Sequence, residues 1–283
     1  MYSFHHGLRC SESNMEGCKL TYNRSVYHKA HAVLFHHRDI SGVESLPQEP
    51  RPWFQKWIWF NWESPANSPH IPELNDMFNL TSSYRLDSHI PVPTGYLTPL
   101  TTQDEGFKPL QKDKLVCWVV SNWNPKFKRV KVYEELKKHI QVEVYGKAFN
   151  RVLPHEEYDK LVPSCKFYLS WENSIDQDYV TEKLFIPMMA GTVPVVLGTS
   201  RANYEESIPG DSFIHVNDFA SPKELAERLI YLDNNPAEYM KYFAWRQRYK
   251  VRMCGHNVCE ACLYLKKHKE YQYFHDLDKW FWG

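Results

Sequence analysis

The feature that most constrains the fold is a regular alternation of strand-like and helical segments from Leu115 onward. Apolar or alternating runs at 115–120, 141–145, 166–170 and 192–197 are typical of strands. Helical periodicity spans 126–139 and 180–190, and Ser221-Pro222-Lys223-Glu224 is a strong start signal for a helix through Leu232. This alternation predicts an α/β fold, with a parallel sheet covered by helices on both faces.

The part before Leu115 is less regular. His31–His36 and Trp57–Asn61 are typical of strands, whereas the proline-rich stretches 47–52 and 91–109 are typical of loops or a linker. We therefore expect a domain boundary near Pro109.

Composition narrows the function classes. Lys plus Arg and Asp plus Glu are both 34, so the chain has no basic footprint for nucleic acid. The 10 Trp, 18 Tyr and 15 Phe residues suit sugar rings, although most buried aromatics are core residues. No apolar run is long enough to span a bilayer. Sequons at Asn23 and Asn79, with seven cysteines, favour a secretory lumen.

Polar residues and glycines follow the predicted strands. They are Ser121 and Asn122, Gly146, the stretch 171–173, and Gly198. In open parallel sheets, ligands bind at the carboxyl ends of the strands, so these residues indicate a site. Each also has a structural interpretation, because strands must end in turns.

The segment Trp171–Lys183, reading WENSIDQDYVTEK, offers groups for a nucleotide. Asn173 has an amide for a base or ribose, Tyr179 an aromatic face, Glu182 an acceptor for ribose hydroxyls, and Lys183 a cation for phosphate. A helix start would add amide donors, and Arg129 on the preceding helix could supply a second cation. The alternative is that Glu182 and Lys183 are solvated helix charges.

Longer motifs resolve this choice, because the sequence resembles the alpha-1,3-fucosyltransferase family, in its vertebrate-type branch that forms Lewis structures. The resemblance covers nearly the whole chain. It is carried by KAHAVLFHHRDI (29–40), NWESP (61–65), LVCWVVSNWNP (115–125), WENSIDQDYVTEKLF (171–185) and AGTVPVVLG (190–198).

This resemblance implies a GT-B-like fold of two Rossmann-like domains facing a central cleft. The implied domains are 1–109 on the acceptor side, without the family's first strand, 110–250 for GDP-fucose, and a cysteine-containing segment 251–283 that packs back on the first domain. It also implies an inverting alpha-1,3 transfer of L-fucose to GlcNAc of N-acetyllactosamine-type glycans on glycoproteins or glycolipids, in the Golgi lumen. Full-length relatives carry a membrane anchor, which no segment of this sequence matches.

The resemblance also implies residue roles. Asn173, Tyr179 and Glu182 would hold guanosine, Arg129 and Lys183 the diphosphate, and Asn122 lies with this donor group. Glu63 in NWESP matches the family's general base, and its place after an aromatic run would partly desolvate it, as suits a base. Its structural alternative is a loop carboxylate paired with an arginine. Arg38 favours alpha-1,3 over alpha-1,4 linkage, and its neighbour His37 is grouped with it, although packing is its expected role.

Three metal sites are conceivable and none is favoured. Asp176-Gln177-Asp178 and Asp276-Leu277-Asp278 match the Asp-x-Asp pattern that holds a divalent cation, but two basic residues already suit the diphosphate, so we expect no essential metal or other cofactor. Cys254, Cys259 and Cys262 with His256 and His268 could bind zinc. Disulfides are preferred: the resemblance implies Cys117 with Cys165, and Cys10 and Cys18 each with one of Cys259 and Cys262, which leaves the state of Cys254 open.

Two rival functions remain at this stage. One is a glycosyltransferase that uses another nucleotide sugar on the same scaffold. The other is a binding protein without catalysis, for which GDP binding with no turnover would be the signature.

Overall fold

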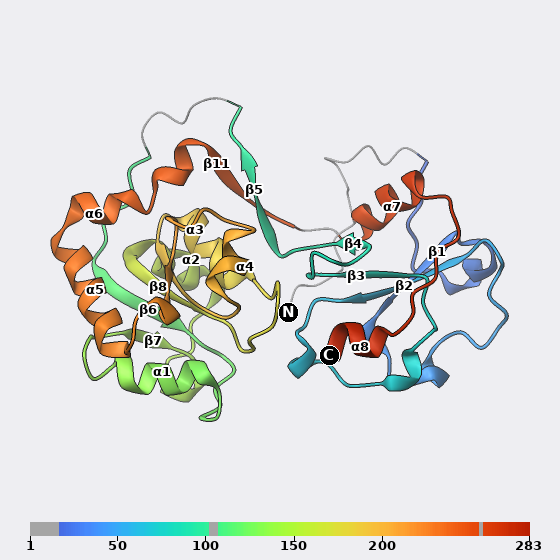
Figure 1. Cartoon of the computed structure of the whole chain (residues 1–283), viewed down its shortest axis with the longest axis horizontal. Helices are drawn as coiled ribbons and strands as arrows, with labels where there is room; N and C mark the ends of the chain where they lie inside the picture. The colour runs from blue at the N-terminus through green and yellow to red at the C-terminus, as the bar shows by residue number, and fades with distance from the viewer. Residues whose placement is uncertain (1–16, 102–106, 255–256) are drawn as a thin grey trace. The chain divides into compact units, whose positions relative to one another are not determined.

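The computed structural model describes residues 17–101, 107–254 and 257–283. They form two compact units: unit 1 contains the chain up to Pro93 and again from Cys254, and unit 2 runs from Thr94 to Met253 (Figure 1). The units part after Pro93 rather than near Pro109. The reason is that β5 (Gly95–Pro99) pairs antiparallel with β11 (Tyr249–Met253), which ties the proline-rich stretch into unit 2.

Unit 2 is built around a five-stranded parallel sheet in the order β10-β9-β8-β6-β7. Its strands are β6 (Lys114–Val119), β7 (Glu143–Tyr145), β8 (Cys165–Trp171), β9 (Val193–Leu197) and β10 (Ile214–His215). Its helices are α1 (Lys128–Leu136), α2 (His155–Ser164), α3 (Glu182–Ala190), α4 (Arg201–Glu205), α5 (Pro222–Asn234) and α6 (Pro236–Lys241). The α/β prediction is confirmed.

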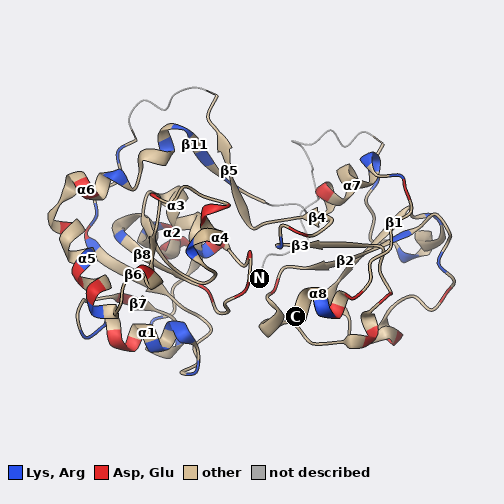
Figure 2. Cartoon of the chain, in the orientation of Figure 1, with Lys and Arg blue, Asp and Glu red and all other residues tan. Residues whose placement is uncertain are grey.

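Helices cover both faces of this sheet because alternate residues of each strand point to opposite sides. Phe167 and Leu169 of β8 pack in a core with residues of α1, α5 and α6, whereas Tyr168 packs with α2. Residues of α3 and α4 form a further core with Val196 of β9. Acidic and basic residues are interspersed along α1 and α5 (Figure 2), as expected for helices with one solvated face.

A disulfide fastens the α2 side of the sheet. Cys117 of β6 bonds Cys165 of β8, with 6.0 Å between their Cα atoms, as the family resemblance implies. Helix α5 begins as predicted, because the Ser221 hydroxyl accepts a hydrogen bond from the Glu224 amide at 3.2 Å.

Unit 1 contains a four-stranded parallel sheet in the order β1-β2-β3-β4. Its strands are β1 (Ala32–His36), β2 (Lys56–Asn61), β3 (Leu80–Ser83) and β4 (Ile90–Pro91), and its helices are α7 (Asn257–Lys267) and α8 (Leu277–Trp282). Ile58 and Phe60 pack toward Ala261 of α7. On the other face, the Trp59 ring lies 4.8 Å from the Phe281 ring of α8.

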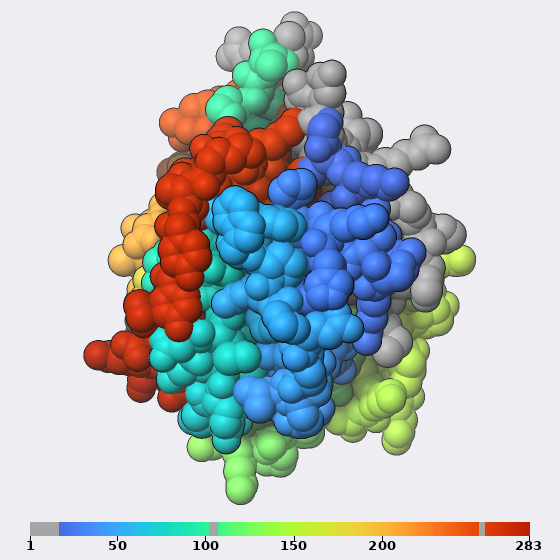
Figure 3. Space-filling model, turned by 90° about the vertical axis from the view of Figure 1, so that its right-hand side faces the viewer, coloured from blue at the N-terminus to red at the C-terminus, as the bar shows by residue number. Residues whose placement is uncertain are grey.

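The C-terminal segment is therefore part of unit 1, and in Figure 3 it runs in red across the blue and teal segments of that unit. Cys18 bonds Cys262 of α7, so the zinc interpretation of that cysteine is wrong. Cys259 is also held in a disulfide, while the predictions for Cys10 and His256 lie outside the described residues. The Lys56 ammonium donates to the carbonyls of His268 and Glu270, at 3.1 and 2.8 Å, and holds the segment on the sheet.

Asn79 is a second anchor of this segment, which corrects the prediction that it is glycosylated. Its side chain is 1% exposed. Its Nδ2 donates to the Gln272 carbonyl at 2.8 Å, and its Oδ1 accepts from the Trp57 amide at 2.8 Å. A glycan needs that nitrogen and open space around it, so the sequon is a structural coincidence. Asn23, by contrast, is exposed.

His37 is buried beneath α8. Its Nδ1 accepts from the Trp59 indole at 3.1 Å and its Nε2 donates to the Pro69 carbonyl at 2.8 Å, so the ring is neutral. Burial lowers the pKa of His37, and also the pKa of His89 and of His215. This geometry supports the packing role for His37 rather than contact with an acceptor.

We predict that one glycan is attached at Asn23 and none at Asn79. After expression in a glycosylating secretory host, Asn23→Gln should remove the mass released by endoglycosidase treatment. Asn79→Gln should leave that mass unchanged but lower the urea midpoint of unfolding, because buried hydrogen bonds are lost. A glycopeptide that contains Asn79 would contradict the structure.

We also predict that stability falls in mild acid. The unfolded chain protonates these histidines near pH ~6.5, whereas the folded protein resists protonation until a lower pH. Stability is therefore full above about pH 6.5 and declines as the pH falls below it. In urea titrations between about pH 7.5 and 5, His37→Gln should flatten this decline. The control His155→Gln changes a side chain that is 83% exposed, and it should keep the wild-type slope.

Candidate functional site

The carboxyl edge of the unit 2 sheet collects the residues predicted from the sequence. Asn122 follows β6, Glu172 and Asn173 follow β8, and Gly198 follows β9. The register aligns these ends, since Trp171 pairs with Leu197. Chain segments far apart in the sequence therefore meet along one edge, as expected for a parallel sheet.

Glu172 is the buried centre of this edge. Its side chain is 1% exposed. Its Oε1 accepts hydrogen bonds from the Thr181 amide at 3.0 Å and the Thr181 hydroxyl at 2.8 Å. Its Oε2 lies 3.2 Å from the Lys183 ammonium. Burial raises the pKa of Glu172, while the Lys183 charge opposes that rise. Sequence reasoning placed Glu172 at a strand end and gave it no role.

Thr181 sets where α3 begins. The helix starts at Glu182 rather than Val180, because Thr181 is extended and its hydroxyl caps the Lys183 amide. The same hydroxyl lies 2.9 Å from the Lys183 ammonium, which also lies 3.1 Å from Oε1 of Glu182. Glu182 and Lys183 therefore point to the same place at the positive end of a nine-residue helix.

The charges of this pair reinforce one another. Burial alone would raise the pKa of Glu182, but attraction to Lys183 outweighs burial and lowers it. Burial alone would lower the pKa of Lys183, but the carboxylates of Glu172 and Glu182 outweigh burial and raise it. Both side chains are consequently ionised at neutral pH. Since 28% of the Lys183 side chain is exposed, its cation remains accessible to an anion.

Arg129 of α1 stabilises the carboxyl edge of the unit 2 sheet. It is 4% exposed, and its two terminal nitrogens donate to the carbonyls of Trp171, at 3.2 Å, and Asn122. The guanidinium therefore clamps the ends of β8 and β6 together. Burial lowers its pKa, and the charge of Glu172 opposes that shift.

Buried polar atoms without a hydrogen-bond partner gather at this edge. Of eight such side-chain atoms among the described residues, four belong to residues at the end of β8 or to Arg129 next to it, once Oε2 of Glu172, which pairs with the Lys183 ammonium, is set aside: Arg129, Ser170, Trp171 and Asn173. Buried polar atoms are normally satisfied, so a concentration of this kind is typical of a site that binds a polar ligand. Oδ1 of Asn173 and Nε of Arg129 are among them.

The loop between β8 and α3 places Tyr179 and the first Asp-x-Asp sequence. Asp178 has a left-handed backbone (φ 61°), and its amide and carboxylate both bond the Asn203 side chain at 2.7 Å. Asp176 accepts from the Ser174 hydroxyl at 2.9 Å. Tyr179 is 4% exposed. Both carboxylates thus have partners within the protein, and in the described part of the chain no group of three or more His, Cys, Asp or Glu is arranged to hold a metal.

Unit 1 carries the predicted base Glu63 and the predicted linkage residue Arg38 after the carboxyl ends of β2 and β1. Glu63 follows β2 and is half-buried, and its amide donates to Oδ1 of Asn61 at 3.1 Å. Arg38 lies in the short 3-10 helix η2 (His37–Asp39) after β1, and it is exposed. Because β1 and β2 are adjacent and parallel, Glu63 and Arg38 lie at the same edge of their sheet.

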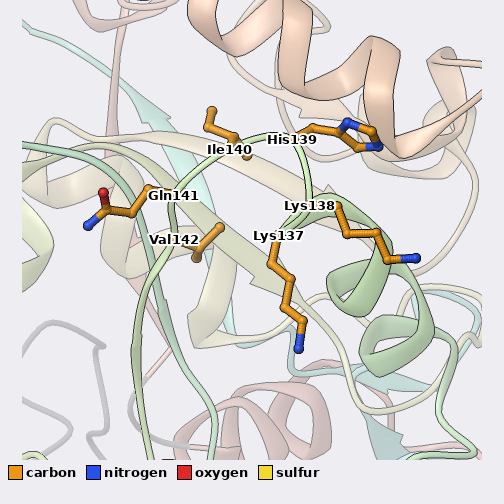
Figure 4. Close-up of a pocket in the computed structure, with 6 residues that line it drawn as sticks. All are labelled: Lys137, Lys138, His139, Ile140, Gln141 and Val142. Atoms are coloured by element: carbon orange, nitrogen blue, oxygen red, sulfur yellow. The ribbon is translucent and has the colours of Figure 1, made fainter.

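A surface hollow lies elsewhere in unit 2. Its lining residues are Lys137, Lys138, His139, Ile140, Gln141 and Val142, which connect α1 to β7 (Figure 4). This connection enters β7 at its amino end, and the predicted ligand edge is the opposite one. The side chains in Figure 4 also diverge around the turn rather than converge on a common point.

Comparisons with known proteins agree with this arrangement. A family model described as glycosyltransferase family 10 (fucosyltransferase) C-term matches residues 109–280, and one described as fucosyltransferase, N-terminal matches residues 2–95. Two crystal structures of alpha1,3-fucosyltransferase have similar folds. The one with GDP-fucose has a TM-score of 0.56 at 18% identity over 80% of this chain and 78% of that one. The other has a TM-score of 0.59 at 16% identity over 85% and 78%.

Relatives found by their sequences are much more similar to this chain than the two solved structures are. The chain is 52% identical over 274 residues to 4-galactosyl-N-acetylglucosaminide 3-alpha-L-fucosyltransferase 9 of Homo sapiens, covering 95% of this chain and 76% of the relative. It is 46% identical over 282 residues to 3-galactosyl-N-acetylglucosaminide 4-alpha-L-fucosyltransferase FUT3 of Bos taurus, covering 96% and 77%. The family models span both units, and these relatives are aligned along nearly the whole chain. The chain therefore belongs to the fucosyltransferases of glycosyltransferase family 10.

Proposed function

We propose that this enzyme transfers L-fucose from GDP-fucose, with inversion, to the 3-hydroxyl of GlcNAc in N-acetyllactosamine-type glycans. The observation that carries the proposal is the cluster at the start of α3, where an accessible cation and an ionised carboxylate follow β8 together with the buried Oδ1 of Asn173, which has no hydrogen-bond partner. A nucleoside diphosphate needs such a combination of phosphate and ribose partners. The names of both relatives support fucose as the sugar, and the 52% identical relative is named for the 3-linkage, whereas the 46% identical one is named for the 4-linkage.

The proposed donor contacts divide by chemistry. Lys183, with the positive end of α3, would bind the diphosphate, and Glu182 would accept from ribose hydroxyls. Asn173 and Tyr179 complete the guanosine side. Arg129 contributes its positive charge and holds Asn122 and the end of β8 in place.

The proposed chemistry is a single displacement. The acceptor oxygen attacks the anomeric carbon of fucose, the bond from that carbon to the diphosphate oxygen breaks, and GDP leaves. Glu63 takes the proton from the acceptor hydroxyl. Lys183 and Arg129 stabilise the negative charge that grows on GDP. Because these cations serve the leaving group, we propose that no divalent metal is essential.

The acceptor side is proposed from Arg38, which is exposed at the edge that also carries Glu63. We propose that it favours alpha-1,3 over alpha-1,4 transfer. The two disulfides of the described residues, Cys18–Cys262 and Cys117–Cys165, favour an oxidising compartment such as the Golgi lumen. None of the described helices is both long and apolar enough to cross a membrane.

Glu63→Gln tests the catalytic assignment. We expect transfer to type 2 acceptors to fall by about 10³-fold or more, because the proton acceptor is lost, while GDP binds nearly as well as to wild type. Transfer would be measured with GDP-fucose and a panel of type 1 and type 2 acceptors, with the linkage read by NMR. Glu73→Gln, at an exposed position of the same unit, is the matched control. Wild-type transfer by Glu63→Gln would remove Glu63 from this role.

Chelation tests the metal assignment. After dialysis against EDTA, turnover with GDP-fucose should stay near its original value, because lysine and arginine neutralise the diphosphate. Loss of turnover that Mn²⁺ restores would contradict the proposal. Adding Mn²⁺ to an untreated sample serves as the control for inhibition by the metal itself.

A further inference from the structure

Glu172 has no part in the reaction as described so far. It is nevertheless the most buried carboxylate at the carboxyl edge of the unit 2 sheet, which is the proposed donor edge. Its side chain is 1% exposed, and Gly198 of the next strand end leaves it room. A Cβ atom on Gly198 would lie 3.2 Å from Cγ of Glu172 and 2.5 Å from the Tyr204 hydroxyl. A buried charge is costly unless it is paired, so its partners indicate what it is for.

Its hydrogen-bond and ion-pair partners belong to the start of α3, and Arg129 of α1 adds a longer-range attraction. One carboxylate oxygen accepts both the amide and the hydroxyl of Thr181, and the other faces the Lys183 ammonium at 3.2 Å. Because the Thr181 hydroxyl gives its proton to Glu172, its lone pairs are turned toward Lys183. They accept from the Lys183 amide at 3.4 Å and lie 2.9 Å from the ammonium. Glu172 thus holds Lys183 directly and also through Thr181.

Glu182 is the third acceptor of the Lys183 ammonium, and unlike that of Glu172 its side chain is partly exposed. Glu182 lies 3.1 Å from the ammonium, but its side chain is 43% exposed and its proposed partner is the ribose. An exposed ion pair of this type fixes geometry weakly. When Glu182 engages ribose, Glu172 and Thr181 are the partners that keep the ammonium in place.

We propose that Glu172 is a positioning residue for donor binding, which fixes the Lys183 ammonium against the diphosphate through its buried carboxylate and the Thr181 hydroxyl. The proposal rests on the proposed function, in which Lys183 binds the diphosphate. A role limited to capping α3 would need only the acceptor oxygen that faces Thr181. A positioning role also needs the negative charge that faces Lys183.

Glu172→Gln separates these two roles, because the amide keeps an acceptor oxygen for Thr181 and loses the charge. We expect kcat/KM for GDP-fucose to fall about tenfold, as for coupled neighbours in one network, with weaker GDP binding and an ordinary KM for the acceptor glycan. The alkaline limb of the pH profile should move to lower pH, since Lys183 loses the carboxylate that favours its protonated form. Glu227→Gln, on the outer surface of α5, is the matched control.

Lys183→Met, alone and combined with Glu172→Gln, completes a double-mutant cycle. If Glu172 acts through Lys183, the double variant loses no more than Lys183→Met alone. The double variant also removes both partners of the buried pair, so it remains informative where Glu172→Gln by itself fails to fold. Cooperative thermal unfolding and near-UV circular dichroism would establish which variants are folded.

The outcomes are distinct. Wild-type GDP binding by folded Glu172→Gln would overturn the proposal, because the negative charge would then not be needed. Tighter binding would also overturn it, because the carboxylate would then repel the diphosphate. Additive losses in the double variant would also overturn it. Wild-type kinetics of Lys183→Met would instead remove Lys183 from the donor site, which is a failure of the proposed function.

Discussion

The proposed donor edge of unit 2 depends on the satisfaction of two buried charges at the end of β8. Glu172 and Arg129 are both buried, and a protein interior tolerates such groups only with partners. Glu172 takes its partners from the start of α3, and Arg129 takes the carbonyls that end β8 and β6. The loop that follows β8 must therefore bring Thr181 back to a fixed position beside Glu172. The same contacts therefore pair the buried charges, as folding requires, and arrange groups that suit the proposed nucleoside diphosphate.

Much of unit 2 could be predicted from the sequence because its signals are local. The Ser221 cap and the apolar run of β9 need no knowledge of distant residues. Helix α3 begins two residues later than predicted, since the apolar Val180 continues the helical pattern, whereas the Thr181 hydroxyl, which Glu172 orients, caps the Lys183 amide. Helix α2 was missed, because its residues His155–Ser164 are mostly polar and include Pro163.

The errors in unit 1 arise from contacts that are distant in sequence. Strand β3 reads Leu80-Thr81-Ser82-Ser83, which is mostly polar, but all four residues are buried. Asn79 looks like a glycosylation site until Gln272, far along the chain, occupies its amide. The candidate site shows the same limit: its residues could be selected from motifs, whereas the role that we propose for Glu172 is argued from its distances to Thr181 and Lys183.

Unit 1 is built from two separate stretches of the chain, and this affects the order in which its parts are synthesised. Unit 2 is contiguous, so all of its strands and the Cys117–Cys165 pair are available once Met253 has left the ribosome. The sheet of unit 1 is made much earlier, but α7, α8 and Cys262 come last. Until they arrive, Trp59 lacks the cover of Phe281, and Cys18 lacks its partner. The apolar face of the unit 1 sheet must therefore stay uncovered while unit 2 is made, so unit 1 is the part of the chain that is exposed to misfolding for longest.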